Sequence, residues 1–454
     1  MDLPSTPRSD DTPSSTDALS VNRTTRLMRP AVDGTAYSAA AQGQIDALQR
    51  FRDVPELGIA FLKKPDVAGR TIAHAAAANG HIHVLQWIRD SPDLGTRFLR
   101  EVTGNGATIA HAAAARGQCN VLQWIRDDPF GIHFLKQATA KGWCIDHAAA
   151  ANGQHDVLEW IRDCPGLELG FLNGKDRPGG WTMVHAAAAK GRADTLQWIR
   201  AGLNLSSGWL EQATVGGWTI AHVAAEVGEL GVLQWILRSD AEFIVRASEF
   251  LIRPMSGGWT IAHVAAASGQ RDALQWMIDG GDSLQFWVDW KDRRWELLAS
   301  PTEDDWTIAH LAAAHGHIRV LQCIHDCPNL GIDFLKRTID NGRTVAHVAA
   351  EFGKCDALRW LFECPELGSE FLKQPTPSKR TVAHAAAASG QCDVLQWLHD
   401  CPGLGVELLK QATRTGVTIA HLAVAAKTHD ALRWIREEPS LGVEFLREHD
   451  LDDC

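Results

Sequence analysis

Residues 71–88 read T-I-A-H-A-A-A-A-N-G-H-I-H-V-L-Q-W-I, from Thr71 to Ile88. The same pattern recurs along most of the 454-residue chain, with Thr or its equivalent three residues before a His and alanines after it. Trp stands thirteen residues after almost every one of these histidines. They are spaced 36 to 47 residues apart, at His74, His111, His147, His185, His222, His263, His310, His347, His384 and His421. Such a period is typical of a solenoid, in which each repeat contacts only its neighbours.

Each repeat predicts two helices joined by a turn. Thr71 is a good N-cap and alanine is the best helix former, so we expect a first helix over residues 71–78. Asn79 and Gly80 tolerate the left-handed conformation that ends it. The apolar residues 84–88 form the centre of a second helix. Because the first helix carries small side chains, neighbouring repeats can approach closely.

The repeat resembles the ankyrin repeat, whose pattern is T-P-L-H-x-A-A-x-x-G-H-x-x-V-V-x-x-L. Ile or Val replaces its Pro, and a segment P-x-L-G-x-x-F-L, as in residues 328–335, lengthens the period from 33 to about 37 residues. The resemblance implies an all-α, ankyrin-like α-solenoid of about 11 stacked helix-turn-helix units in a curved array. The added segment lies where ankyrin repeats have a β-hairpin, so each connection is either a hairpin or an extra short helix.

The repeats set the domain organisation. Residues 1–33 are rich in Ser, Thr and Pro and predict a disordered leader, and residues 34–446 form the repeat array. Insertions fall at about 237–258 and 278–305, and an acidic tail follows at 447–454. The first repeat is degenerate and the last carries Lys427 in place of the recurrent glycine, as expected of the capping ends of a solenoid.

Composition and motifs argue against several classes of function. The net charge is −11 with acidic and basic residues interleaved, so we expect no nucleic-acid partner. No apolar run is long enough to span a bilayer. The sequence contains no nucleophile elbow, phosphate loop, zinc-protease helix or kinase signature.

The cysteines predict reduced thiols rather than a metal site or disulfides. Most lie at equivalent positions of successive repeats, and no C-x-x-C pair occurs. The nearest approach to a ligand cluster is Cys323-x-His325-x-Cys327. However, Cys323 fills the Trp position of its repeat, which favours a packed helix. We therefore expect neither a metal nor a cofactor.

The ten histidines and the tryptophans thirteen residues later are interpreted as structural. The resemblance implies that the histidines hydrogen-bond to local and neighbouring backbone, and repeats about 10 Å apart hold imidazoles too far apart to share a metal. We expect the second set to fill the layers between repeats, at Trp87, Trp124, Trp160, Trp198, Trp235, Trp276, Trp360, Trp397 and Trp434.

A further set of tryptophans directly precedes the Thr position in five consecutive central repeats: Trp143, Trp181, Trp218, Trp259 and Trp306. The other repeats hold Arg, Ala or Val there. By the resemblance, this position lies near the tips that line the concave face, where exposed tryptophans would form a protein-binding hot spot. The alternative is that each ring covers the apolar segment of its own repeat.

Other candidate binding residues lie where the repeats vary. The larger insertion contributes Trp287 and Trp290. The position five residues after each His varies freely and includes Lys190, Val227 and Phe352. Variation on an otherwise constant repeat is what a specific binding surface requires.

These features favour a monomeric, non-enzymatic scaffold that binds one or more protein partners. The leader resembles the secretion signals of bacterial type III effectors, many of which carry ankyrin arrays. This resemblance implies a secreted virulence factor that acts on host proteins in the host cell cytoplasm. Two alternatives stay open: a cytoplasmic ankyrin adaptor that is not secreted, and an enzyme with a site in the 277–306 insertion.

Overall fold

The computed structural model describes residues 35–55, 57–127, 130–167, 178–202, 212–238, 249–280 and 288–441. The leader, the acidic tail and Trp287 lie outside these residues, as do parts of both insertions, at 239–248 and 281–287. Trp290 falls within a described helix, but its side chain lies outside what the structure describes.

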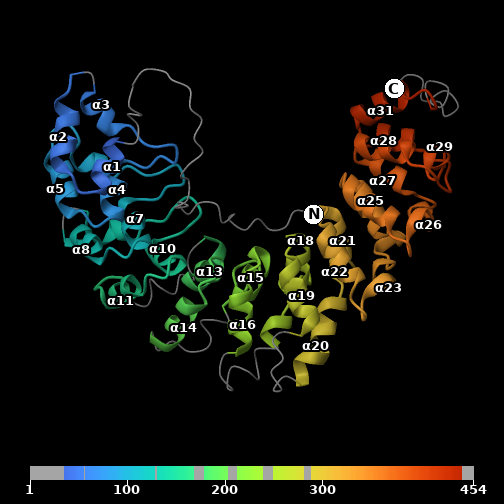
Figure 1. Ribbon diagram of the computed structural model, residues 1–454, viewed down its shortest axis with the longest axis horizontal. Coiled ribbons are helices and arrows are strands. Elements are labelled where there is room, and N and C mark those ends of the chain that lie inside the picture. Colours follow the sequence, from blue (N-terminus) through green and yellow to red (C-terminus); the bar gives the residue numbers. More distant parts are fainter. Residues whose placement is uncertain are drawn as a thin grey trace. The chain divides into compact units, whose positions relative to one another are not determined.

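The described residues form eleven pairs of antiparallel helices (Figure 1). The first helices are α1 (Thr35–Ala41), α4 (Ile72–Ala78), α7 (Ile109–Ala115), α10 (Ile145–Ala151), α13 (Met183–Ala188), α15 (Ile220–Val227), α18 (Ile261–Ala267), α21 (Ile308–His315), α24 (Val345–Glu351), α27 (Val382–Ala388) and α30 (Ile419–Ala425). The second helices are α2 (Ile45–Asp53), α5 (Ile82–Asp90), α8 (Cys119–Asp127), α11 (His155–Asp163), α14 (Ala193–Gly202), α16 (Leu230–Arg238), α19 (Arg271–Asp279), α22 (Ile318–His325), α25 (Cys355–Glu363), α28 (Cys392–Asp400) and α31 (His429–Glu437). The all-α solenoid predicted from the sequence is confirmed.

Six of the connections between repeats contain an extra short helix. It is present as α3 (Gly58–Lys63), α6 (Gly95–Leu99), α9 (Gly131–Leu135), α23 (Gly331–Leu335), α26 (Gly368–Lys373) and α29 (Gly405–Leu409). A tight turn follows it: the amide of Thr103 donates to the carbonyl of Ala107, and that of Gly104 donates to Ala68 in the preceding repeat. The described residues contain no strand, apart from one isolated bridge between Ile339 and Arg343. In these six connections the chain therefore adopts the short helix, with a turn at its end.

Other irregular elements are few. Among the described residues, two 3-10 turns occur, at η3 (Pro178–Gly180) and η5 (Asp340–Gly342). Within the larger insertion, α20 (Val288–Ala299) buries Leu297 and Leu298. This helix therefore packs part of the insertion against the array.

The chain divides into two compact bodies, Met1–Val223 and Ala224–Cys454. In the N-terminal body each first helix contacts the next, from α1 through α4, α7 and α10 to α13. In the C-terminal body the same contacts run from α18 through α21, α24 and α27 to α30. The alanines on these helices are almost all buried, as at Ala76 and Ala113 (both 0% exposed). Small side chains thus allow close packing of neighbouring first helices.

The tryptophan set on the second helices is only partly buried, which differs from the expectation that it fills the layers between repeats. Trp276 is 7% exposed, whereas the other eight are half-buried. The core of this layer consists instead of aliphatic side chains such as Val84, Leu85 and Ile88, each 0% exposed. Two of these indoles form hydrogen bonds between repeats: Trp160 Nε1 donates to Gln123 Oε1 of the preceding second helix at 3.1 Å, and Trp434 Nε1 donates to Gln396 Oε1 at 2.8 Å.

Candidate protein-binding surface

Six of the ten recurrent histidines join their repeat to the next. The amide of Thr71 donates to His74 Nδ1 at 3.3 Å, which completes a capping box at the start of α4. His74 Nε2 lies 3.1 Å from the carbonyl oxygen of Ala107 in the following repeat. Because Nδ1 accepts and the carbonyl requires a donor, the proton resides on Nε2. The same bond joins His111 to Trp143, His147 to Trp181, His185 to Trp218, His347 to Arg380 and His384 to Val417.

Burial lowers the pKa of seven of the recurrent histidines and so favours their neutral form. It lowers the pKa of His74 and His384 below the ordinary 6.5. It lowers the pKa of His111, His185, His263, His310 and His347 to about 4. In His74, His111, His185, His347 and His384, Nδ1 accepts from a backbone amide and Nε2 donates to a backbone carbonyl, an arrangement typical of a structural histidine.

Three tryptophans of the row that precedes the Thr position, Trp143, Trp181 and Trp218, accept a hydrogen bond at their backbone carbonyl from the histidine of the preceding repeat. Trp143 and Trp181 are half-buried in the N-terminal body, and their rings stack with centroids 6.5 Å apart and an interplanar angle of 29°. Trp143 also stacks on His147 at 5.7 Å. These two indoles form a continuous aromatic surface across two repeats. Trp218, at the same position of the next repeat, is only 4% exposed and offers little surface to a partner.

In the C-terminal body, the tryptophans that precede the Thr position also differ in burial. Trp259 is half-buried, and Trp306 is 7% exposed. The ring of Trp306 meets that of Phe352 edge-on at 6.3 Å, and Phe352 itself is 37% exposed. Phe352 is therefore the aromatic side chain that this pair presents to solvent.

The variable position five residues after each His lies at the surface. Lys190 and Val227 are half-buried, whereas Arg116, His315 and Ser389 are exposed like Phe352. These side chains differ in charge, size and polarity from repeat to repeat. The helix ends thus offer distinct chemistry on a repeated scaffold.

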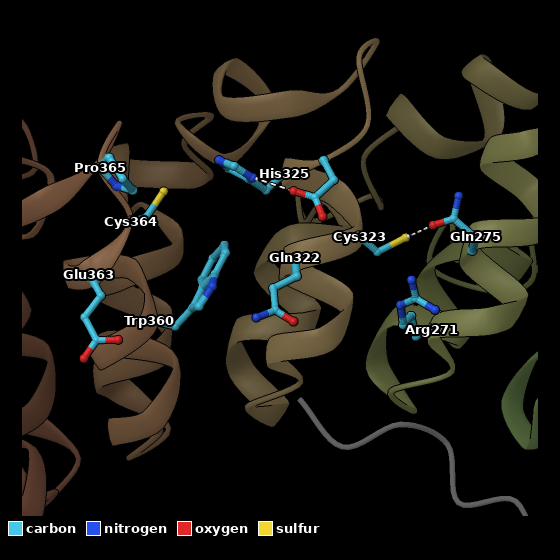
Figure 2. A pocket seen from close by; sticks show the side chains of 10 residues that line it. Arg271, Gln275, Gln322, Cys323, His325, Trp360, Glu363, Cys364 and Pro365 are labelled. Carbon is cyan, nitrogen blue, oxygen red and sulfur yellow. Dashed lines mark hydrogen bonds and ion pairs between the residues drawn. The ribbon is translucent and has the colours of Figure 1, made fainter.

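A polar pocket of about 470 Å³ lies between second helices of the C-terminal body (Figure 2). It is lined by Arg271, Gln275, Gln322, Cys323, His325, Asp326, Trp360, Glu363, Cys364 and Pro365. Cys323 Sγ donates to Gln275 Oε1 at 3.3 Å, so Cys323 faces the preceding repeat and not His325. Burial raises the pKa of Cys323 to about 11. The sequence reasoning did not find this pocket, although His325, in a position held by Arg in several other repeats, was a signal.

The cysteines of the described part of the chain are free thiols, as their spacing predicted. Among the described residues, none of the helices combines the length and the apolar character needed to cross a bilayer. Both findings are compatible with the composition of the sequence.

Comparison with known families matches residues 146–247 and 263–374 to the family of ankyrin repeats (3 copies). The matched ranges contain six of the recurrent histidines, namely His147, His185, His222, His263, His310 and His347. No match is found among curated proteins. Ankyrin repeats serve as scaffolds for protein–protein interaction. The matched ranges and the stacked helix pairs together identify the chain as an ankyrin-repeat protein.

Proposed function

We propose that the chain is a non-enzymatic scaffold that binds a protein partner through the turns and first helices of its central repeats. The observation that carries this proposal is the stacked, half-buried pair of Trp143 and Trp181. Large aromatic side chains dominate the binding energy of protein interfaces, and these two are held rigidly by the histidines behind them. Lys190, in the turn that follows α13, adds a polar contact near the same surface.

In the C-terminal body, we propose Phe352 and Trp259 as further contacts, together with Val227. Phe352 is exposed and its ring rests against Trp306, which limits the entropy lost on binding. Trp306, which is 7% exposed, supports this surface, and Trp218, which is 4% exposed, has the corresponding position in the N-terminal body. Trp287 and Trp290 of the insertion complete the set of candidate binding residues.

The absence of an enzymatic role is supported by the chemistry of the described side chains. Burial lowers the pKa of seven of the recurrent histidines, and it raises the pKa of the thiols of Cys323 and Cys364. A thiol with a raised pKa is a poor nucleophile at neutral pH. Deleting the 277–306 insertion tests the enzyme alternative, because a scaffold retains partner binding through its other repeats.

The binding surface is tested by capture of partner proteins from candidate host lysate. The double variant Trp143→Ala/Trp181→Ala should lose capture, while Trp87→Ala, a half-buried tryptophan on a second helix, should retain it. Thermal unfolding of each variant checks that the fold persists. Undiminished capture by a folded double variant would contradict the proposal.

We further propose that the protein is a secreted bacterial effector with a host protein as partner, and that it is a monomer. The support is the Ser/Thr/Pro-rich composition of residues 1–33, which resembles type III secretion signals. A reporter fused to residues 1–33 should be translocated into host cells. Retention of the reporter in the bacterium would instead favour a cytoplasmic adaptor. Light scattering should give the mass of one chain, 49.6 kDa.

A further inference from the structure

Three potential metal ligands from two successive repeats meet in the C-terminal body. His325 is the last residue of α22, Cys364 directly follows α25, and Glu366 lies two residues further on. Figure 2 shows the side chains of His325 and Cys364 pointing towards one another beside Trp360. The imidazole nitrogen, the thiol sulfur and the carboxylate oxygen all lie within 4.8 Å of one another. The stacking of the repeats thus creates a cluster that no single segment contains.

The distances match those of a small metal site. Glu366 Oε2 lies 3.3 Å from Cys364 Sγ and 3.4 Å from His325 Nε2. Ordinary zinc bond lengths of about 2.3 Å to sulfur and 2.0–2.2 Å to nitrogen and oxygen place tetrahedral donors about 3.4–3.6 Å apart. The three side chains therefore need only small movements to bind one ion.

A fourth residue orients the imidazole. Asp326 Oδ1 lies 2.9 Å from His325 Nδ1, which leaves Nε2 directed at Cys364 and Glu366. Histidine ligands of metals commonly donate their second ring nitrogen to a carboxylate, which fixes the orientation of the ring. Asp326 therefore stands where such a positioning residue is required.

Other repeats show that this arrangement is not a general consequence of the fold. The position of His325 is held by arginine at Arg89, Arg126 and Arg162, each paired with the Asp that follows it. At one of these, Arg126 Nη1 lies 3.9 Å from Cys164 Sγ, the counterpart of Cys364. A guanidinium cannot ligate and repels a cation. Replacement of this arginine by histidine converts the contact into a set of donors.

We propose that His325, Cys364 and Glu366 bind one Zn²⁺ ion, with the fourth position open to water. Nitrogen, sulfur and carboxylate donors together suit zinc, and three protein ligands leave an open position. Cys364 is 6% exposed, whereas the side chains of His325 and Glu366 are 26% and 54% exposed, so the ion has a path from solvent. The site differs from the Cys323-x-His325-x-Cys327 segment, of which it uses only His325. The ion links two neighbouring repeats and stabilises their stacking.

The chain provides a control thiol. Cys401 occupies the position of Cys364 one repeat later, but the counterpart of His325 on the preceding helix is Phe362. Titration of the full-length reduced protein with Zn²⁺, followed by calorimetry, should show a site that Cys364→Ser removes and Cys401→Ser leaves intact. With Co²⁺, wild type and Cys401→Ser should show thiolate-to-metal charge-transfer absorption that Cys364→Ser lacks.

Two further variants separate loss of a ligand from loss of the fold. Glu366 is half exposed, so Glu366→Gln should leave unfolding in the absence of metal unchanged while weakening Zn²⁺ binding. Asp326→Asn should weaken binding by roughly 10–100-fold, the usual effect of losing an outer partner. Zn²⁺ should raise the unfolding temperature of wild type and of Cys401→Ser, but not of Cys364→Ser. Equal Zn²⁺ affinity in wild type, Cys364→Ser and Glu366→Gln would overturn the proposal.

Discussion

The indole rings of Trp143 and Trp181 lie with their centroids 6.5 Å apart and their planes 29° from parallel. Each ring belongs to a different repeat, and the backbone carbonyl of each accepts a hydrogen bond from the histidine of the repeat before it. The distance between the rings is thus set by the spacing of the repeats.

Replacing two tryptophans at equivalent positions should change the free energy of unfolding by different amounts, because the two rings differ in burial. Trp218→Ala should lower the free energy of unfolding by about 3–5 kcal/mol, because the ring is 4% exposed. Trp181→Ala should cost clearly less, because its ring is half-buried. Urea unfolding followed by circular dichroism measures both. Equal losses would assign Trp181 to the core and remove it from the binding surface.

Removing one recurrent histidine should weaken two repeats at once. In His111→Ala, the amide of Thr108 and the carbonyl of Trp143 lose their partner, which should cost about 2–4 kcal/mol. His133→Ala, an exposed histidine in the same body, serves as the control and should have little effect. Comparable denaturation midpoints for the two variants would show that the bond between repeats contributes little.

The histidines should also make the fold sensitive to mild acid. Five of them have a folded-state pKa of about 4 against the ordinary 6.5, so the unfolded chain binds more protons between these values. Stability is fully present above about pH 6.5 and falls as the pH drops towards 4. Below pH 4, each of these five histidines lowers the free energy of unfolding by about 3 kcal/mol relative to its value above pH 6.5.

Urea midpoints measured between pH 7 and pH 4.5 test this dependence. The hydrogen bond from Arg126 lowers the pKa of Asp127 from 3.8. Aspartates of this kind therefore affect the free energy of unfolding only at lower pH, and they do not obscure the effect of the histidines between pH 7 and pH 4.5. His111→Gln removes one titrating group and should flatten the profile. A midpoint that is constant over this range would contradict the assignment of buried neutral histidines.

The turn of the last repeat should be improved by glycine. Lys427 adopts a positive φ of 59°, where the earlier repeats have glycine, such as Gly390 at 71°. A left-handed conformation costs a residue with a side chain roughly 1–2 kcal/mol. Glycine avoids this cost, but its greater conformational entropy in the unfolded chain offsets part of the gain in stability. Lys427→Gly should therefore raise stability by roughly 0.5–1 kcal/mol in thermal or urea unfolding. A loss of stability would indicate that the lysine side chain makes a stabilising contact.

Much of the fold could be predicted from the sequence because the residue pattern of each repeat predicts its own pair of helices. Thr71 and His74 predict the helix start, and the capping box between them explains why these two residue types recur at this spacing. The extra helix in the connections stayed open, because five or six residues with Leu and Phe suit either a turn or a short helix.

Burial and the composite site were harder to predict. The position of Trp87 relative to the layer between repeats depends on how the second helix is rotated, and the period alone does not determine this rotation. Trp181 and Trp218 share a position but differ in burial, since burial depends on the neighbouring segments. The cluster of His325, Cys364 and Glu366 combines residues about 40 positions apart, which only the stacking brings together.

The histidine of one repeat bonds to a backbone oxygen of the next, and every residue type carries such an oxygen. Ala107, Trp143, Arg380 and Val417 are therefore interchangeable as acceptors. The side chain at this position takes no part in the hydrogen bond between the repeats. At the half-buried positions of this row, such as Trp143 and Trp181, the side chain can therefore be changed to suit a new partner while the hydrogen bond between the repeats is kept.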